Sequence, residues 1–283
     1  MINYNEVFNK ILESSKKSKD VSKDYLKSDI IGNTIIGRFI PNVKNPENSV
    51  LEYFHHGWKS KLDNSGIFIL CPNTYHEKCP VCGKSVEMWK SSDPVKKELS
   101  KFLRRRQNWL TNFYVQTNPK NKEDDGKLKI FRFGKQIHDK YKSATEGDDV
   151  QYYGERIFRL DDQGCSFRIK CEQNSTSKEA WPTYNNSSFL PHSAIEGMTP
   201  EKIEELHNTV HDLMGTFKKS THKEILDIMD KHFFCNEVSA IPEVLEAPKQ
   251  TVQEEKATVA APTPPKDGEV TDSTIDDMLK DLV

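Results

Sequence analysis

The residues with the clearest chemistry lie between His55 and Cys82, in HHGWKSKLDNSGIFILCPNTYHEKCPVC. Cys79 and Cys82 form a Cys-x2-Cys turn that can direct two thiolates toward one metal ion, and Cys71 lies eight residues earlier. One histidine nitrogen and three thiolate sulfurs form a tetrahedral set that Zn²⁺ favours in structural sites. The segment therefore predicts one structural zinc ion.

The histidine of this set is less certain than the cysteines, because three candidates lie in or beside the segment. His56 is preferred, with His55 and His76 as alternatives. His76 lies between Cys71 and Cys79, which leaves the chain little slack to present all three side chains. Four protein ligands leave no position for water, so we expect this ion to stabilise structure and not to catalyse.

A second pattern interleaves cations with aromatic residues. Phosphates attract cations in any sequence context, and every base has a face that can stack on a ring. A groove lined in this way is expected to bind single-stranded nucleic acid with little sequence preference. The candidate contacts are Arg104, Arg105, Arg106, Trp109, Lys129, Phe131, Arg132, Lys135, Trp181 and Tyr184.

Phe131, Arg132 and Phe133 alternate, so a strand would place both rings on one face and the arginine on the other. One or both rings can then belong to the core instead of the groove. The arginine triplet alone would equally suit a solvated helix face.

No catalytic pattern competes with this reading. The sequence has no phosphate-binding lysine loop, no nucleophile elbow and no carboxylate cluster suited to a catalytic metal. We therefore expect a protein that is not an enzyme. The alternative function is a zinc-ribbon regulatory factor that contacts RNA or polymerase, and a metal-stabilised nuclease is disfavoured.

Charge is unevenly distributed along the chain. The net charge of the 283 residues is −2, but residues 243–283 carry −6 and residues 1–242 carry +4. Six cysteines without a signal peptide or a long apolar run predict a soluble protein of the reducing cytoplasm. Cys165, Cys171 and Cys235 lack metal spacing and are expected to be buried thiols.

Apolar bursts separated by Asn, Gly and Pro predict short strands. They are TIIGRFI, VLEYF, GIFIL, NFYVQT, KLKIFRF, RIFRL and SFRIKC. Helices are predicted from Asp93-Pro94 through KKELSKFLRRRQNW, from Thr199-Pro200 with Ile203, Leu206, Val210 and Leu213 on one face, and around 224–234. The expected fold is mainly β with flanking helices (α+β), a small, partly closed barrel interrupted by a zinc subdomain.

Four regions are expected along the chain. Residues 1–24 form a short N-terminal arm, and 25–241 form the core with the zinc subdomain at about 55–90. Residues 242–271, rich in Pro and Glu and without aromatic residues, predict a disordered linker. Residues 272–283 place apolar side chains on one helical face among aspartates, which predicts a partner-binding tail.

The order of these motifs resembles the single-stranded-DNA-binding proteins of T-even-like bacteriophages. The resemblance rests on HHGW before the three cysteines, on RRR before Trp109, and on KIFRFGKQIHDK, WPTYNNSSFLPHSAI and the acidic C-terminus. It implies an OB-fold core, one zinc held by His56, Cys71, Cys79 and Cys82, and cooperative coating of single strands during replication, recombination and repair. It also implies docking of replisome and recombination proteins on the tail, for which the candidate residues are Ile275, Asp276, Asp277, Leu279 and Leu282.

Overall fold

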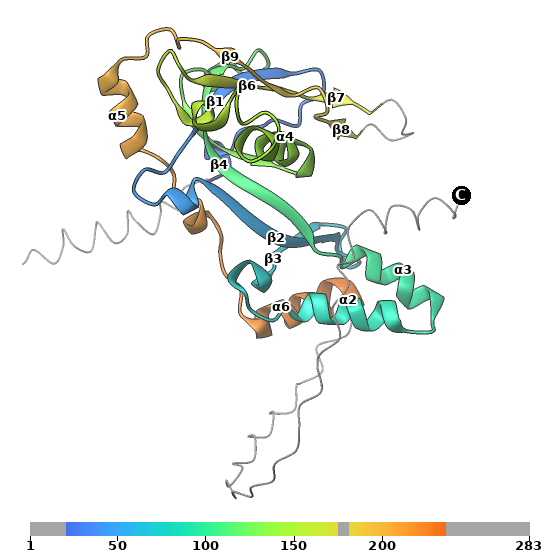
Figure 1. Cartoon of the computed structure of the whole chain (residues 1–283). Helices are drawn as coiled ribbons and strands as arrows, with labels where there is room; N and C mark the ends of the chain where they lie inside the picture. Colours follow the sequence, from blue (N-terminus) through green and yellow to red (C-terminus); the bar gives the residue numbers. More distant parts are fainter. Residues whose placement is uncertain (1–20, 175–180, 236–283) are drawn as a thin grey trace, which may run out of the picture. The chain divides into compact units, whose positions relative to one another are not determined.

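The fold is described from a computed structural model, which covers residues 21–174 and 181–235 (Figure 1). The chain divides into two compact units, Met1–Ser239 and Ala240–Val283. The second unit lies outside the described residues, as does the N-terminal arm up to residue 20. The predicted linker, the tail and most of the predicted arm therefore stay predictions.

An antiparallel sheet of seven strands forms the centre of the first unit, in the order β3-β2-β4-β1-β6-β9 with β5 on the other edge of β4. Its strands are β1 (Thr34–Ile40), β2 (Val50–Lys59), β3 (Gly66–Leu70), β4 (Arg106–Thr117), β5 (Leu128–Phe133), β6 (Cys165–Lys170) and β9 (Ser188–His192). A separate hairpin pairs β7 (Glu172–Gln173) with β8 (Pro182–Thr183). The predicted α+β class is confirmed, whereas barrel closure stays a prediction because the pairings among the described residues leave the sheet open.

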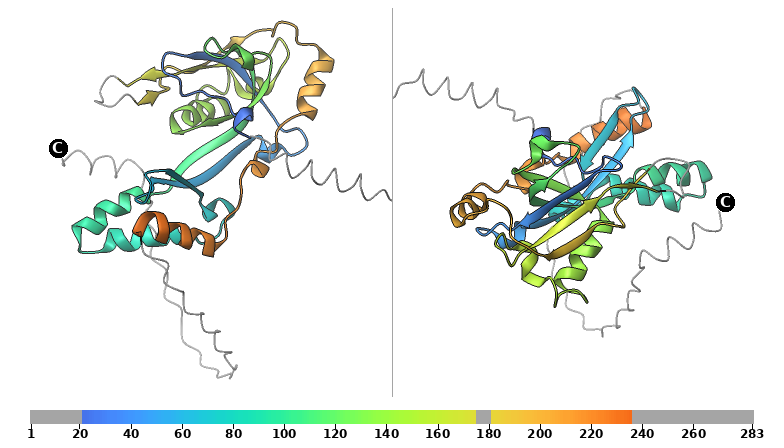
Figure 2. Two further views of the ribbon diagram at one scale, coloured as in Figure 1. Left: turned by 180° about the vertical axis from the view of Figure 1, so that it is seen from behind. Right: turned by 90° about the horizontal axis from the view of Figure 1, so that it is seen from above.

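β4 is the longest strand and joins the two halves of the sheet, as Figures 1 and 2 show. Its residues 106–111 pair with β2, its residues 112–117 pair with β1, and β5 lies along its other edge. Its side chains are buried on both faces from Trp109 to Val115. Trp109, Phe113 and Val115 enter the main core with Phe131, whereas the alternate residues enter two smaller clusters.

β1 approaches β4 closely at Gly37. A Cβ atom at this position would collide with the Tyr114 carbonyl oxygen and the Phe113 ring, so only glycine fits. The pairing register between the two strands shifts between Ile36 and Gly37. The next residue, Arg38, is fully buried and is described in the Discussion.

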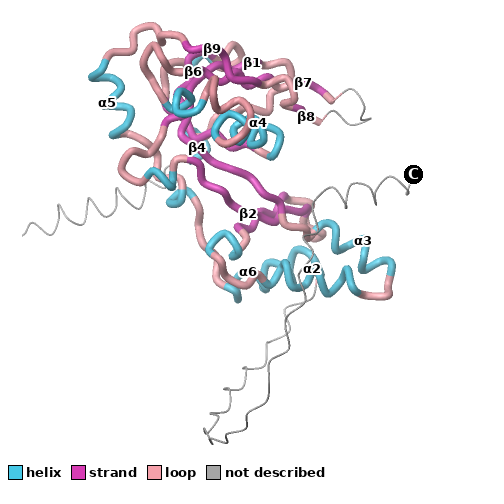
Figure 3. Tube along the Cα trace, in the orientation of Figure 1, coloured by secondary structure: helices cyan, strands magenta, loops and turns pink. Residues whose placement is uncertain are grey.

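The lower half of Figure 3 contains the metal module, which consists of β2, β3, α2 (Pro80–Lys90) and α3 (Pro94–Phe102). Its own core contains Trp58, Ile69, Val81, Met88 and Leu103. The late helix α6 (His222–Met229) and the π-helix Asp230–Phe234 close this core with Ile225, Met229 and Phe233. The remaining helices are α4 (Lys135–Thr145) and α5 (Pro200–Asn208), and α5 begins at the predicted cap Thr199.

Three predicted elements need correction. α3 ends at Phe102, and Arg106–Trp109 extend as part of β4 because pairing with β2 and packing of the Trp109 ring outweigh local helix propensity. RIFRL is not a strand, since Gly154–Phe158 form a 3₁₀ helix. Leu213 lies beyond the end of α5 and packs in a different cluster from Leu206.

The free cysteines divide between the interior and the surface. Cys165 and Cys171 are buried, as predicted. Cys235 is exposed, so its predicted burial is wrong; it follows the π-helix in a left-handed conformation that ends the described chain.

Candidate metal centre and nucleic-acid interface

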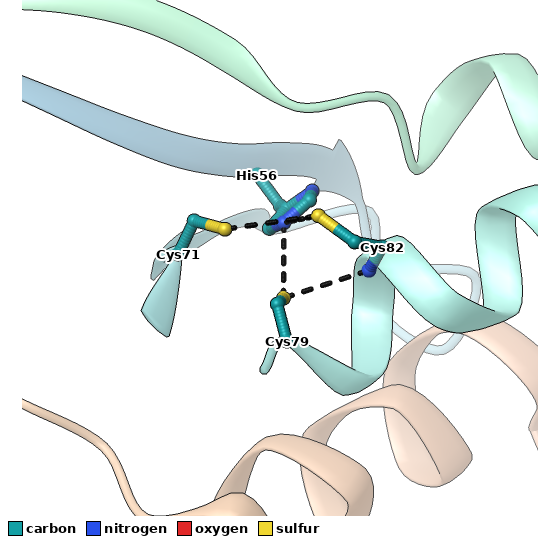
Figure 4. Close-up of side chains that lie close together, drawn as sticks. All are labelled: His56, Cys71, Cys79 and Cys82. Atoms are coloured by element: carbon teal, nitrogen blue, oxygen red, sulfur yellow. Dashed lines mark hydrogen bonds between the residues drawn. The ribbon is translucent and has the colours of Figure 1, made fainter. Parts of the chain in front are cut away.

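His56, Cys71, Cys79 and Cys82 converge on one point inside the metal module (Figure 4). Their ligand atoms all lie within 4.8 Å of one another. The Nε2 atom of His56 lies 3.4 Å from the Cys79 Sγ and 3.5 Å from the Cys82 Sγ, and the Cys71 and Cys82 sulfurs are 3.8 Å apart. Among the residues that the structure describes, no other group of three or more His, Cys, Asp or Glu side chains meets so closely.

These separations fit a tetrahedral zinc ion. Zn–S bonds of about 2.3 Å and Zn–N bonds of about 2.0–2.1 Å place tetrahedral sulfurs about 3.8 Å apart and nitrogen about 3.6 Å from sulfur. The observed distances agree with both values within about 0.2 Å. The cluster can therefore hold a metal ion such as zinc.

Each side chain is placed by a regular element. His56 lies in β2 opposite Ile69, and Cys71 follows the last residue of β3. Cys79 is the N-cap of α2, where its sulfur accepts a hydrogen bond from the Cys82 amide at 3.5 Å, and Pro80 occupies the first turn. A hairpin and a helix N-terminus thus bring together residues from three points in the chain.

A second hydrogen bond orients the imidazole. The Nδ1 atom of His56 lies 2.8 Å from the Leu103 carbonyl oxygen, which accepts its proton and leaves Nε2 free to face the thiols. His56 and Cys71 are fully buried, while Cys79 and Cys82 are half-buried. Such enclosure suits a structural ion more than a catalytic one.

Proximity shifts the pKa values of the cluster in different directions. Burial lowers the pKa of His56, but hydrogen bonds with Cys71 and Cys79 outweigh it and raise the value to about 9. Hydrogen bonds with Cys71 and Cys82 lower the pKa of the Cys79 thiol. Hydrogen bonds with Cys71 and Cys79, and then burial, raise the pKa of the Cys82 thiol. A divalent cation at the centre would favour the thiolate of every cysteine.

The two alternative histidines lie elsewhere. His55 points to the other face of β2, where its ring stacks on Phe68 at 5.1 Å and its Nδ1 lies 3.3 Å from the Asn108 amide nitrogen. His76 ends the 3₁₀ turn Pro72–Tyr75 in a left-handed conformation, away from the cluster. The geometry thus brings His56, and not His55 or His76, to the three thiols.

The face of the sheet that carries His55 combines rings and cations. Across the strands, His55 pairs with Arg106, Gly57 with Phe68, and Leu110 with Arg132, so these side chains share one face. Phe68 is 52% exposed although it is a large apolar residue. Burial, and then Arg106 and Arg132, lower the pKa of His55 to about 4, so its imidazole is neutral at pH 7.

A cleft of about 710 Å³ opens on this face beside the metal module. Phe68, Phe102 and Trp181 are exposed rings in its wall, and Trp181 is 59% exposed. Its lining residues are His55, Gly57, Trp58, Lys59, Lys61, Ile67, Phe68, Leu99, Phe102, Arg106, Trp181 and Phe233. Aromatic walls with lysine and arginine beside them suit bases and phosphates of a flexible strand.

A second pocket of about 580 Å³ lies beside β5. Arg132, Asn108 and Tyr184 line it, together with the chain segment Tyr25–Asp29. Asn108 connects the two hollows, because its amide also contacts His55 in the first cleft. We call the larger hollow the aromatic cleft. We call the smaller one the strap pocket, after the chain segment Tyr25–Asp29 that lines it.

The predicted arginines separate by location. Arg106 lines the aromatic cleft and Arg132 lines the strap pocket. Arg104 lies over the Trp89 ring at 5.5 Å, and Arg105 lies over the Phe54 ring at 4.3 Å with a 2.7 Å hydrogen bond to the Asn73 side chain. Arg104 and Arg105 line neither hollow.

Three other predicted contacts make interactions within the protein instead. Phe131 is 0% exposed and belongs to the core, so it offers no face to a base and is withdrawn as a contact. Trp109 is 6% exposed and stacks on His138 at 3.8 Å. Lys129 forms an ion pair with Asp124 at 3.0 Å and donates to the Lys23 carbonyl oxygen at 2.7 Å, so its charge is already balanced.

Tyr184 and Lys135 complete the predicted set. Tyr184 lines the strap pocket, and burial raises the pKa of its phenol to about 12. Lys135 is the first residue of α4 and lines neither hollow.

Sequence reasoning missed Phe68, His55 and Asn108 as cleft residues. Phe68 lies in GIFIL, where alternation of a strand could have shown it opposite to the buried Ile69. The positions of His55 and Asn108 depend on the pairing of β2 with β4, which the sequence does not specify.

Residues 31–233 match the profile of the family described as gp32 DNA binding protein like. The chain belongs to this family. Two similar relatives are named single-stranded DNA-binding proteins: that of Enterobacteria phage T4 is 28% identical over 221 residues, and that of Enterobacteria phage T2 is 27% identical over 223. Each alignment covers 76% of this chain and 70% of the relative.

Membership confirms the resemblance to the phage proteins, and the family consists of DNA-binding proteins that are not enzymes. The matched region includes the whole metal cluster and the lining of both hollows except for Tyr25–Asp29. No helix among the described residues is long and apolar enough to cross a membrane.

Proposed function

We propose that this protein binds single-stranded DNA without base preference, along the face that carries His55, Arg106 and Arg132. The observation that supports this most directly is the union of exposed rings and unburied cations on one side of β2, β4 and β5. A single strand can offer bases to Phe68 and Trp181 while its phosphates meet the arginines. A duplex hides the faces of its bases and fits such a cleft poorly.

We further propose that the metal is one zinc ion, held by His56, Cys71, Cys79 and Cys82. Its part is to fix β2 against α2, because those ligands come from the hairpin and the helix N-terminus. β2 is also the strand that carries His55 into the aromatic cleft. The ion would therefore support the DNA-binding face from behind.

The names of the relatives support a biological role in phage DNA metabolism. We propose that the protein coats template strands cooperatively during replication, recombination and repair in the host cytoplasm. Residues 1–24 would contact a neighbouring copy on the strand. Ile275, Asp276, Asp277, Leu279 and Leu282 would dock replisome and recombination proteins.

The decisive experiment is a titration of the full chain with poly(dT), read by quenching of tryptophan fluorescence. We expect tight, saturable binding whose affinity falls with salt, and much weaker binding to a duplex of equal length. Poly(dA) and poly(dC) should bind with similar salt dependence. Equal affinity for duplex and single strand would overturn the proposal.

A second assay addresses the tail. A labelled peptide of residues 272–283 should bind a replication protein of the same virus, such as its DNA polymerase, with a rise in fluorescence anisotropy. The Leu279→Asp peptide keeps the acidic character but interrupts the apolar face, and it should not bind. Equal binding of both peptides would show that the partner recognises the acidic charge of the tail and not its apolar face.

A further inference from the structure

The segment Lys23–Asp29, which we call the strap, forms one wall of the strap pocket. It runs beside β5, where the Leu26 amide donates to the Ile130 carbonyl oxygen at 2.9 Å. The ammonium group of Lys129 donates to the Lys23 carbonyl oxygen at 2.7 Å. The Tyr184 hydroxyl donates to the Ser28 carbonyl oxygen at 3.4 Å. The strap is thus tied down at its beginning, middle and end.

The charges of the strap pocket are of both signs. Lys27 and Arg132 line it as cations, and the carboxylate of Asp29 lines it as the only acid. Gly134, the N-cap of α4, also lines it and provides no side chain to cap the first helical amides. Two cations and the start of an eleven-residue helix favour an anionic group.

The ring of Tyr184 is not free to stack in this pocket. It packs against the main core, its backbone amide donates to Gln136 at 2.8 Å, and its hydroxyl is bonded to the strap. The aromatic cleft, in contrast, exposes three rings. The two hollows therefore suit different parts of a nucleotide chain.

We propose that the strap pocket receives the sugar–phosphate of one nucleotide of the same DNA strand whose bases enter the aromatic cleft, with Lys27 and Arg132 as its cationic contacts. This inference rests on the proposed function. Asn108 supports the continuity of the path, since it lines the strap pocket and its amide lies 3.3 Å from the Nδ1 of His55, which lines the aromatic cleft. Lys129 and Tyr184 are then positioning residues, which hold the strap and do not touch DNA.

Opposite changes on the strap test the contact. Lys27→Ala should weaken binding of a dT oligonucleotide about 3- to 10-fold near 0.1 M salt and lower the slope of log affinity against log salt by about 0.7. Asp29→Asn should strengthen binding, because it removes the opposing charge. Both side chains are exposed, so the fold should be unaffected. Lys44→Ala, an exposed lysine that lines neither hollow, is the matched control.

Lys129→Met tests the positioning role. It should lower affinity with an unchanged salt slope, because the ammonium group that is lost was paired with Asp124 and not with phosphate. A slope that falls by about 0.7 would instead make Lys129 a direct contact. Its melting temperature, measured beside the wild type, separates loss of strap contact from unfolding.

The outcomes also separate this inference from the proposed function. If the wild type binds single strands but the Lys27 and Asp29 variants behave like Lys44→Ala, the strap pocket is off the path and the inference is wrong. If the wild type binds single-stranded and duplex DNA equally well, the proposed function itself is wrong. Opposite shifts from Lys27→Ala and Asp29→Asn would support both.

Discussion

His55 and His56 are consecutive residues of β2 whose side chains serve opposite faces of the sheet. His56 turns its Nε2 toward the sulfurs of Cys79 and Cys82 at 3.4 and 3.5 Å. His55 turns toward Phe68 and Asn108 in the cleft. Because alternate strand residues face opposite sides, a bond that holds His56 also fixes the position of His55. The candidate metal centre and the proposed DNA-binding face are thus joined through one peptide unit.

Removal of the metal should destabilise the protein strongly. Binding of a structural zinc ion supplies on the order of 10 kcal/mol of apparent free energy at neutral pH. Since 1 kcal/mol shifts Tm by about 2–4 °C in a domain of this size, we expect chelation or Cys82→Ser to lower Tm by at least about 10 °C. Differential scanning calorimetry and metal analysis of the same samples measure both effects.

Cys235→Ser is the matched control for that experiment, because Cys235 is an exposed thiol outside the cluster. It should leave one zinc per chain and an unchanged Tm. A purified protein without stoichiometric metal, or a melting curve that chelators do not move, would contradict the proposed zinc site.

Arg106 and Arg132 should contribute to affinity through phosphates. Each contact with a single strand accounts for about 0.7 of the slope of log affinity against log salt. We expect Arg106→Ala and Arg132→Ala each to reduce the slope by this amount and to weaken every homopolymer alike. Arg156→Ala, an exposed arginine outside both hollows, should change neither quantity. Unequal losses among homopolymers would instead indicate base contacts.

The exposed rings should act without a salt signature. Stacking on an aromatic residue is worth about 1–3 kcal/mol per base and releases no counterions. Phe68→Ala and Trp181→Ala are therefore expected to weaken binding about 5- to 100-fold at an unchanged salt slope, measured by titration at several salt concentrations. Full affinity in both variants would remove the aromatic cleft from the DNA path.

Phe131→Ala provides the contrasting case. Phe131 is fully buried beside Phe113 and Phe133, so its truncation should cost about 3–5 kcal/mol of unfolding free energy. At temperatures where the variant is folded, its DNA affinity should equal that of the wild type. A selective loss of affinity would restore Phe131 as a contact.

Arg38 is a buried cation that should stabilise the fold and not bind DNA. Its guanidinium donates to the Arg159 and Asp161 carbonyl oxygens at 2.9 and 2.7 Å and also to that of Ser193. Arg38→Met would remove these buried hydrogen bonds, so we expect a loss of about 3–5 kcal/mol in urea unfolding. The salt slope of DNA binding should stay the same, and Arg156→Met should affect neither measurement.

Deletion of residues 1–20 should separate cooperativity from intrinsic affinity. The variant is expected to bind a dT oligonucleotide of one site length like the wild type, because the strap begins after the deleted residues. On poly(dT) it should bind more weakly, since contacts between neighbours are lost. Equal losses on both substrates would assign the arm to DNA contact.

The sequence was sufficient to predict the metal cluster and the α+β class. Ligand spacing identifies Cys71, Cys79 and Cys82 because a Cys-x2-Cys turn has few other uses, and the strand pattern of TIIGRFI and KLKIFRF follows from local alternation. His56 could not be separated from His55 by spacing alone. Their different roles come from the direction of each side chain in a paired strand.

Long-range pairing explains what sequence reasoning missed. Local helix propensity extended α3 through Trp109, but the hydrogen bonds of β4 to β2 and β5 decide that segment. The same pairing brings Arg106 into the cleft and buries Trp109, although the sequence predicted both residues as contacts to DNA. Lys129 was predicted to meet phosphate because it stands next to Phe131 and Arg132 in sequence, whereas the turn before β5 brings it to Asp124, five residues earlier in the chain.

The late position of α6 bears on how the chain is made. The metal ligands and the hairpin β2–β3 are all synthesised by Cys82, whereas α6, which covers Trp58 and Val81, begins at His222, about 140 residues later. At a translation rate of about 5–20 residues per second, Trp58 and Val81 are synthesised roughly 7–28 seconds before α6 can cover them. Metal captured by the nascent chain would hold the hairpin closed during that interval and limit contact with other unfinished chains. A bound ion would thus stabilise the hairpin while the chain is still on the ribosome, before any DNA is bound.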